Sequence, residues 1–462
     1  MLLPGRTSVW MVLCLVLAPA GARAQASAAD TVIVGLAEAE ARALEQSPLL
    51  GPALASVEIA RAQQSRAEHA RFLPELKLRN VWGPIPRARG EFNEFGVLMS
   101  PDTMTGLDDL TWFTQVDLNF VQPLYTFGKL GATLDAARHQ VEAVRADVQK
   151  TRAEVLLQVR QLYWGALLSE ELLGVSRSVN DRVAEAEQRL QELYDEGDAS
   201  QNDLFKFEIF KYQVRSQTRE VESGRTKALA ALKAMVGVPD SVPIRLADAS
   251  LDALQVELDS LSAYVREALA SRPELQQLEA GIAARRALVR AAEAASRPTL
   301  FLAGQLSINE SPGRFDPRNP FVNNPTNFTR PGLVVGFDWN LNFRDNRDKA
   351  AVERFEAEKL EAQARPLRLM IEQQVREAYL DVERARIDVE EGRDALRASE
   401  NLLRAELQTF DIGLGSIDDV IDAFQSNVTM AVEQLRNIAE LNTKLAELSR
   451  RVGRDIAARS TR

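Results

Sequence analysis

Residues 130–155 read LGATLDAARHQVEAVRADVQKTRAEV and carry the clearest structural signal of the chain. Its small and apolar residues recur at alternating steps of four and three, which is the heptad spacing of a coiled coil. They are Leu130, Leu134, Ala137, Val141, Val144, Val148, Thr151 and Val155. No proline occurs from Leu124 to Val238. We therefore predict a helix from near Gly128 to near Tyr194, on the order of 100 Å long at about 1.5 Å per residue.

The core stripe of an ordinary globular bundle is the alternative interpretation of this pattern, because alanine and threonine occupy some of its positions. The second half of the chain repeats the pattern on a later helix, at Phe424, Val428, Ala431, Leu435 and Ile438. The predicted length favours an extended coiled coil over the globular alternative.

The chain carries two copies of one plan. Many residues return at a constant offset of 216, for example Val159 at Val375. Other pairs are Arg160 and Arg376, Tyr163 and Tyr379, Gly197 and Gly413, Ser200 and Ser416, and Asp203 and Asp419. We expect a first repeat at 36–238, a linker at 239–260, a second repeat at 261–454 and a tail at 455–462.

Segments with period-two alternation precede the long helix in each copy, as expected for strands. They run from Leu76 to Trp82, from Trp112 to Phe120, from Leu300 to Asn309 and from Val335 to Leu341. The polar face is expected to carry Gln115, Asp117, Asn119, Asp338 and Asn340. Such alternation fits a membrane barrel with a polar lumen and also a half-buried sheet of a soluble protein.

The long loops between the strands, 83–110 and 310–331, favour the barrel over the soluble sheet. Four strands are too few to close a barrel, since the smallest membrane barrels have about eight. The barrel interpretation therefore requires several copies of the chain. Two copies give eight strands and three give twelve, and the spacing leaves both open.

The first 24 residues have the layout of a secretory signal peptide, with cleavage expected after Ala24. The single cysteine, Cys14, lies in its apolar run, and the bulky Leu13 before it argues against lipidation. Residues 1–24 hold two arginines and no acid, so the remainder has 54 basic and 66 acidic residues and a net charge of −12. Such an acidic chain is a poor nucleic-acid binder.

Enzyme chemistry finds no support in the residue types. The two histidines, His69 and His139, belong to separate predicted helices, and no cysteine follows the signal peptide. Neither metal-ligand spacing nor a nucleophile with its base is present. We expect no catalytic, cofactor or metal site.

The order of elements, duplicated, resembles the TolC family of outer-membrane efflux proteins. The residues that carry the resemblance are Gln122-Pro123-Leu124-Tyr125 before the first long helix, and Tyr194-x-x-Gly197 and Phe410-x-x-Gly413 at the turns. The resemblance implies a mainly α fold with membrane β, in which a homotrimer forms a 12-stranded outer-membrane barrel. A periplasmic helical coiled-coil barrel continues it and docks to a periplasmic adaptor and an inner-membrane pump.

The family's function implies roles for residues at the two helix turns. The pattern Gly-x-x-x-Ile-x-Asp-x-x-Asp places a channel constriction at Asp419 and Asp422. For Asp419, helix capping by the Ser416 turn is the alternative role. The turn residues expected to contact the adaptor are Gly197, Ser200, Asp203, Phe410, Gly413, Gly415 and Ser416.

A soluble periplasmic adaptor-like coiled-coil protein is the rival interpretation, and it predicts strands in a small soluble domain.

The sequence departs from the family pattern at Pro366 and at residues 339–346. Because proline removes a helical hydrogen bond and clashes with the preceding turn, we predict a bend or a break near Arg365-Pro366.

Overall fold

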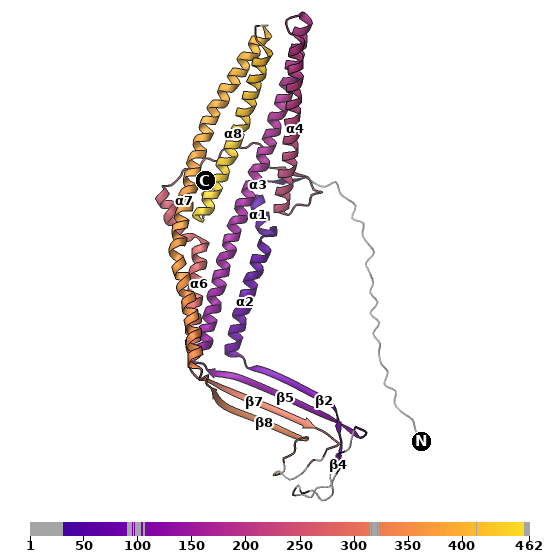
Figure 1. Ribbon diagram of the computed structural model, residues 1–462, viewed down its shortest axis with the longest axis vertical. Coiled ribbons are helices and arrows are strands. Elements are labelled where there is room, and N and C mark those ends of the chain that lie inside the picture. Colours follow the sequence, from indigo (N-terminus) through magenta and orange to yellow (C-terminus); the bar gives the residue numbers. More distant parts are fainter. Residues whose placement is uncertain are drawn as a thin grey trace, which may run out of the picture.

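The computed structural model describes residues 31–89, 95, 97, 103–104, 107–314, 316, 321, 323–412 and 414–456. The expected signal peptide, Gly413 and residues 457–462 of the expected tail lie outside the described residues. Figure 1 shows an elongated molecule with one large sheet at one end and two helix turns at the other. Within the described ranges, no helix is both long enough and apolar enough to cross a membrane.

Two long helices, α3 (Lys129–Glu196) and α7 (Phe343–Asp411), run from the sheet to the turns. Glycines in the left-handed region flank α3, with φ of 91° at Gly128 and 89° at Gly197, a conformation that costs other residues energy. Leu134, Val141 and Val155 of the heptad stripe are buried. The predicted long coiled-coil helix is confirmed.

Shorter helices lie end to end beside each long one (Figure 1). In the first repeat they are α1 (Leu36–Gln46), α2 (Leu50–Phe72) and α4 (Gln201–Val236). In the second they are α5 (Leu261–Ser271), α6 (Pro273–Ala294) and α8 (Ile417–Val452). Pro48 and Pro273 end the preceding helix in both copies, because proline favours an extended conformation for the residue before it. Ser47 and Arg272 both have this conformation.

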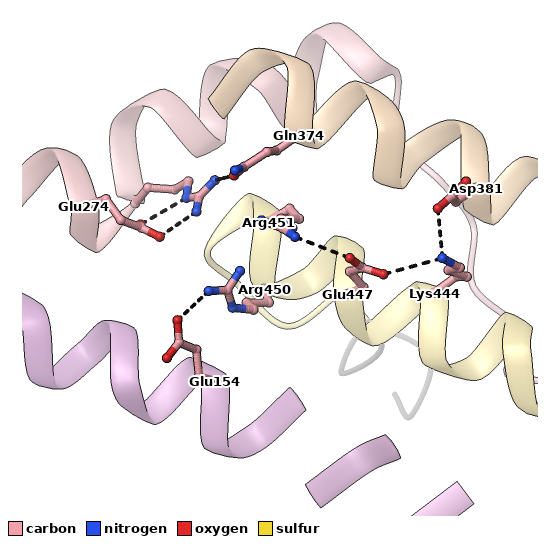
Figure 2. A network of polar contacts seen from close by, with 9 residues as sticks. Glu154, Glu274, Gln374, Asp381, Lys444, Glu447, Arg450 and Arg451 are labelled. Carbon is pink, nitrogen blue, oxygen red and sulfur yellow. Dashed lines mark hydrogen bonds and ion pairs between the residues drawn. The ribbon is translucent and has the colours of Figure 1, made fainter. Parts of the chain in front are cut away.

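A belt at mid-height joins the two repeats. A short parallel pair, β1 (Val32–Val34) with β6 (Ile244–Leu246), brings the start of the chain to its middle. Arg160 of α3 donates to Glu40 of α1 at 2.6 Å and pairs with Asp455 beyond α8. Figure 2 shows another part of the belt, where Arg450 of α8 lies 2.7 Å from Glu154 of α3.

The large sheet has the order β2-β5-β7-β8 and is antiparallel throughout. Its strands are β2 (Glu75–Pro86), β5 (Leu110–Tyr125), β7 (Thr299–Glu310) and β8 (Phe328–Asp338). A small hairpin, β3 (Ala88–Arg89) with β4 (Thr103–Met104), lies beyond β2. The central pair joins β5 of the first repeat to β7 of the second, so the repeats share one sheet.

The last strand differs from the prediction. It begins at Phe328, before Pro331, and ends at Asp338, so Asn340 does not lie on the sheet. In the single chain β8 is an edge strand, the position in a sheet where proline is found. Asn340 instead accepts a hydrogen bond from the Asn342 backbone N–H at 2.9 Å, which turns the chain toward α7.

A break at Pro366 does not occur. Helix α7 continues through Pro366 and is bowed along its length (Figure 1). The carbonyl of Ala362, which loses its partner N–H, lies on an exposed stretch, so it is open to solvent. On the other side, Ile371 and Val375 are fully buried and keep the helix packed.

Candidate functional site

The large sheet separates polar from apolar side chains. The register places Gln115, Asp117 and Asn119 of β5 opposite Asn309, Ser307 and Gln305 of β7. Asp117 accepts hydrogen bonds from Gln115 Nε2 at 2.7 Å and from Ser307 Oγ. Asp338 pairs with Thr299 and therefore lies on this same polar face, nearest the helices.

The opposite face is apolar and uncovered in the single chain. Leu78 is 70% exposed and Phe337 is 67% exposed. The other large side chains of this face include Leu76, Trp82, Trp112, Leu118, Leu300, Leu333 and Val335. A contiguous apolar surface of this kind marks contact with lipid or another protein.

Aromatic rings lie at both ends of the apolar face. At the end away from the helices, the rings of Trp82 and Trp112 are 6.0 Å apart. At the helix end, an irregularity between Pro123 and Tyr125 shifts the register so that Tyr125 pairs with Leu300 on the apolar side. The apolar face therefore has aromatic side chains at both of its ends.

The first helix turn, between α3 and α4, is closed by a reciprocal cap. The Ser200 hydroxyl accepts the Asp203 N–H, and the Asp203 carboxylate accepts the Ser200 N–H at 2.9 Å. Hydrogen bonds from the Ser200 side chain and then its backbone hold the pKa of Asp203 below its usual value, against a smaller effect of burial. Gly197 ends α3 and accommodates the left-handed backbone.

The second turn, between α7 and α8, uses a different glycine. A Cβ on Gly415 would lie 2.8 Å from the Phe410 backbone nitrogen, so the turn has no room for a side chain there. Ser416 caps α8 by accepting the Asp419 N–H at 3.2 Å, and its hydroxyl donates to Asp419 Oδ2 at 2.8 Å. Asp419 therefore has a capping role in the single chain.

The two candidate constriction residues differ in their contacts. Asp419 and Asp422 are both exposed on α8. Asp422 makes no hydrogen bond or ion pair with any residue in the part of the chain that the structure describes. They lie one helical turn apart, on neighbouring positions of one face. No group of histidine, cysteine and acidic residues that could hold a metal occurs within the described ranges.

Phe410 is buried at 4% exposure, in an apolar core shared by both turns. This core includes Phe207, Phe210 and Phe424, and the rings of Phe210 and Phe424 are 6.1 Å apart. Phe410 therefore packs the two hairpins together, whereas Ser200, Asp203 and Ser416 are less deeply placed at the turns.

Two polar contacts between the turns were missed from the sequence. Lys206 Nζ of α4 lies 2.5 Å from Asp418 Oδ2 of α8, and this contact raises the pKa of Lys206. Arg189 of α3 donates to the Asp411 carbonyl at the end of α7 at 2.8 Å. The available signal was a difference in charge between repeats, because the offset of 216 aligns Lys206 with Asp422.

Comparisons with known proteins agree with this architecture. The family model described as outer membrane efflux protein matches residues 41–238 and 264–454. Protein CyaE of Bordetella pertussis is 26% identical over 337 residues, which cover 70% of this chain and 67% of that protein.

Two solved channels show the same fold. The outer-membrane channel OprN superposes with a TM-score of 0.72 at 16% identity, covering 91% of this chain and 90% of OprN. The CmeC outer membrane channel of Campylobacter jejuni also gives 0.72 at 16% identity, covering 90% of this chain and 85% of CmeC.

Proposed function

This chain belongs to the outer membrane efflux protein family, and on that premise we propose that three copies form a passive channel from the periplasm to the exterior. The observation that carries the proposal is the four-stranded sheet, polar on one face and apolar on the other, joined to helices of 68 and 69 residues. The polar face lines the lumen and the apolar face contacts the outer-membrane lipid.

The free edges of the sheet support assembly. In one chain β2 and β8 each have an unpaired edge, and in lipid each unpaired backbone group costs several kcal/mol. Pairing β8 of one copy with β2 of the next removes the edges. Three copies give the twelve-stranded barrel that the family implies.

The height of the apolar face supports insertion. Trp112 and Tyr125 are 13 positions apart on β5, or about 43 Å at about 3.3 Å per residue. A strand tilt of about 45° reduces this to about 30 Å, the thickness of a typical hydrocarbon core. The aromatic rings then lie at the two interfaces.

The helices form the periplasmic part of the conduit. Each repeat, 36–238 and 261–454, supplies one long helix and the shorter helices beside it to the wall of the conduit. Phe205, Ile209 and Tyr212 are exposed on α4, as expected for a surface that a neighbouring copy covers. The turns at the far end dock to the periplasmic adaptor and thereby to the inner-membrane pump of an efflux or type I secretion system.

The turn after α7 supplies the constriction. Threefold symmetry gathers Asp419 and Asp422 of each copy, six carboxylates in all, around the entrance. Their field attracts cations and holds hydrated divalent ions. The link from Lys206 to Asp418 and the bond from Arg189 to the α7 terminus hold the two hairpins of each copy together.

The adaptor-like alternative is less well supported. It expects the strands in a small soluble domain, where the apolar side of a sheet is covered by its own chain. Here that side stays exposed along β2 and β8. Export by an N-terminal signal peptide, without lipidation, is part of this proposal and rests on the sequence.

The test is single-channel conductance of the detergent-extracted protein in planar bilayers, with a polyvalent cation added on the helical side. Wild type should show small, cation-selective openings that the cation blocks, and Asp419→Ala with Asp422→Ala should lose the block. Asp195→Ala with Glu196→Ala, two acids at the first turn, is the matched control. Recovery as a soluble protein that never inserts would contradict the proposal.

A further inference from the structure

A small cavity lies where α3 and α6 reach the large sheet (Figure 1). Its volume is about 430 Å³, and its lining includes Phe127, Arg290 and Arg297. Gly131 of α3 also lines it, and a Cβ at this glycine would have no atom within 4 Å. The cavity therefore has room for a polar group the size of a phosphate.

The cavity adjoins the apolar face of the sheet. The Phe127 ring lies 4.7 Å from the ring of Tyr125, which is on the apolar side at the helix end of β5. The carbonyl of Ser296, next to Arg297, accepts a hydrogen bond from the Trp339 indole at 3.0 Å. Aromatic residues of these types gather at membrane interfaces. In the proposed channel, the cavity thus lies at the level of the lipid headgroups on the helical side.

The guanidinium of Arg297 is available for a ligand. Arg297 is exposed, and its side chain forms no hydrogen bond or ion pair with the residues that the structure describes. A cation just beyond a helix C-terminus often binds the last carbonyls. Here those carbonyls accept hydrogen bonds from groups other than this guanidinium, at Ala294, Ala295 and Ser296. Capping of α6 therefore does not account for the side chain.

The charges around the cavity are positive in sum. Two acids line it and both are paired, since Glu293 lies 3.3 Å from Arg354 and Asp135 lies 3.6 Å from Arg138 and 3.8 Å from Arg290. With the unpaired arginine described above, four positive charges less two negative ones leave a surplus of +2. Such a surplus attracts an anion.

We propose that this cavity binds the phosphate group of a phospholipid, with Arg297 as the main donor. The inference rests on the proposed channel, because insertion of the sheet is what brings the cavity to the headgroups. A guanidinium binds phosphate through two parallel N–H donors. The acyl chains of the same lipid continue along the apolar face beyond Tyr125. All residues of the site belong to one copy, so the site does not depend on how copies pair.

The test is native mass spectrometry of the detergent-extracted protein with added dioleoylphosphatidylglycerol. Wild type should bind this lipid at least about tenfold more tightly than Arg297→Gln, the effect of one charged hydrogen-bonded pair. Dioleoylglycerol, which has the same chains without the phosphate, should bind both proteins equally. Arg219→Gln, from an exposed arginine of α4 without a partner among the described residues, should behave as wild type.

Arg297→Gln removes no contact seen within the described ranges, so the variant should fold and conduct normally. Arg297→Lys keeps the charge without the fork and should bind the phospholipid with intermediate affinity. Inorganic phosphate in excess should leave the lipid bound, and its displacement would contradict a lipid as the ligand.

Equal binding of the phospholipid by wild type and Arg297→Gln, with normal conductance of both in planar bilayers, would overturn the site and leave the channel intact. Absence of conductance in wild type would instead contradict the proposed function itself.

Discussion

The two helix turns are built on the same residues but differ in charge. Both cap the following helix with a serine and an aspartate three positions later, at Ser200 and at Ser416. Beyond the caps the repeats diverge, since Lys206 of the first aligns with Asp422 of the second. Positions that the repeats share form the helix caps of the two turns. Positions where the repeats differ give the second turn its acidic surface.

The largest expected effect comes from an aromatic pair at equivalent positions. Phe410 is 4% exposed and its counterpart Tyr194 is 38% exposed. Phe410→Ala should lower the local stability of the turns by about 3–5 kcal/mol, because it opens a cavity in the shared core. Tyr194→Ala should cost much less. Amide hydrogen exchange of the α4 and α8 first turns measures both, and equal losses would contradict the asymmetry.

The next effect separates the two glycines. Gly415→Ala should cost about 1–3 kcal/mol, because its Cβ meets the Phe410 backbone. Gly197→Ala should cost about 1–2 kcal/mol through its left-handed backbone alone. Limited proteolysis of the purified protein should cut the second turn faster in Gly415→Ala. It should cut the first turn faster in Gly197→Ala. A single common cleavage pattern would show that the turns are not independent.

A smaller effect distinguishes the two serine caps. Ser200→Ala and Ser416→Ala should each cost about 1 kcal/mol, with the larger loss at Ser200 because its capping box is reciprocal. The pKa of Asp203 is lowered, so its capping contribution is present at neutral pH. This contribution is lost as the pH falls from the ordinary pKa of 3.8 through the lower pKa of the folded state. Exchange rates of the Asp203 and Asp419 amides, measured against pH, check this order.

The smallest effect concerns the exposed pair of Lys206 and Asp418. Lys206→Gln should lengthen channel openings at low salt, because it removes the link to Asp418 that holds the two hairpins together. It should have little effect at about 1 M salt, where exposed charges are screened. Lys227→Gln on the same helix, from a lysine without a partner among the described residues, is the control. Longer openings at both salt concentrations would assign the effect to something other than charge.

Much of the architecture followed from the sequence, because its signals are local and long. The heptad stripe predicted α3, whereas the division of the short helices near Pro48 and Pro273 was found only in the structure. Asn340 was misplaced because its side chain accepts the backbone N–H of Asn342, which alternation does not reveal. At Pro366 the helix does not break, because packing of the buried Ile371 keeps it continuous.

The candidate site was predictable only in part. The polar face of the sheet follows from alternation, so Gln115, Asp117 and Asn119 were found. The link between Lys206 and Asp418 joins residues 212 apart in the chain, and the contact of Gly415 with the Phe410 backbone is a property of the folded turn. A difference in charge between the repeats is the one sequence signal for the link, and the contact at Gly415 has none.

The parallel pair of β1 and β6 has a consequence for biogenesis. Val32–Val34 pairs with Ile244–Leu246, so the first strand is synthesised long before its partner. Until then its backbone groups are an open template for pairing with other chains. A nascent molecule is therefore exposed to wrong pairing at its first strand until residue 246 has emerged, and rapid completion of the chain or a chaperone shortens that interval.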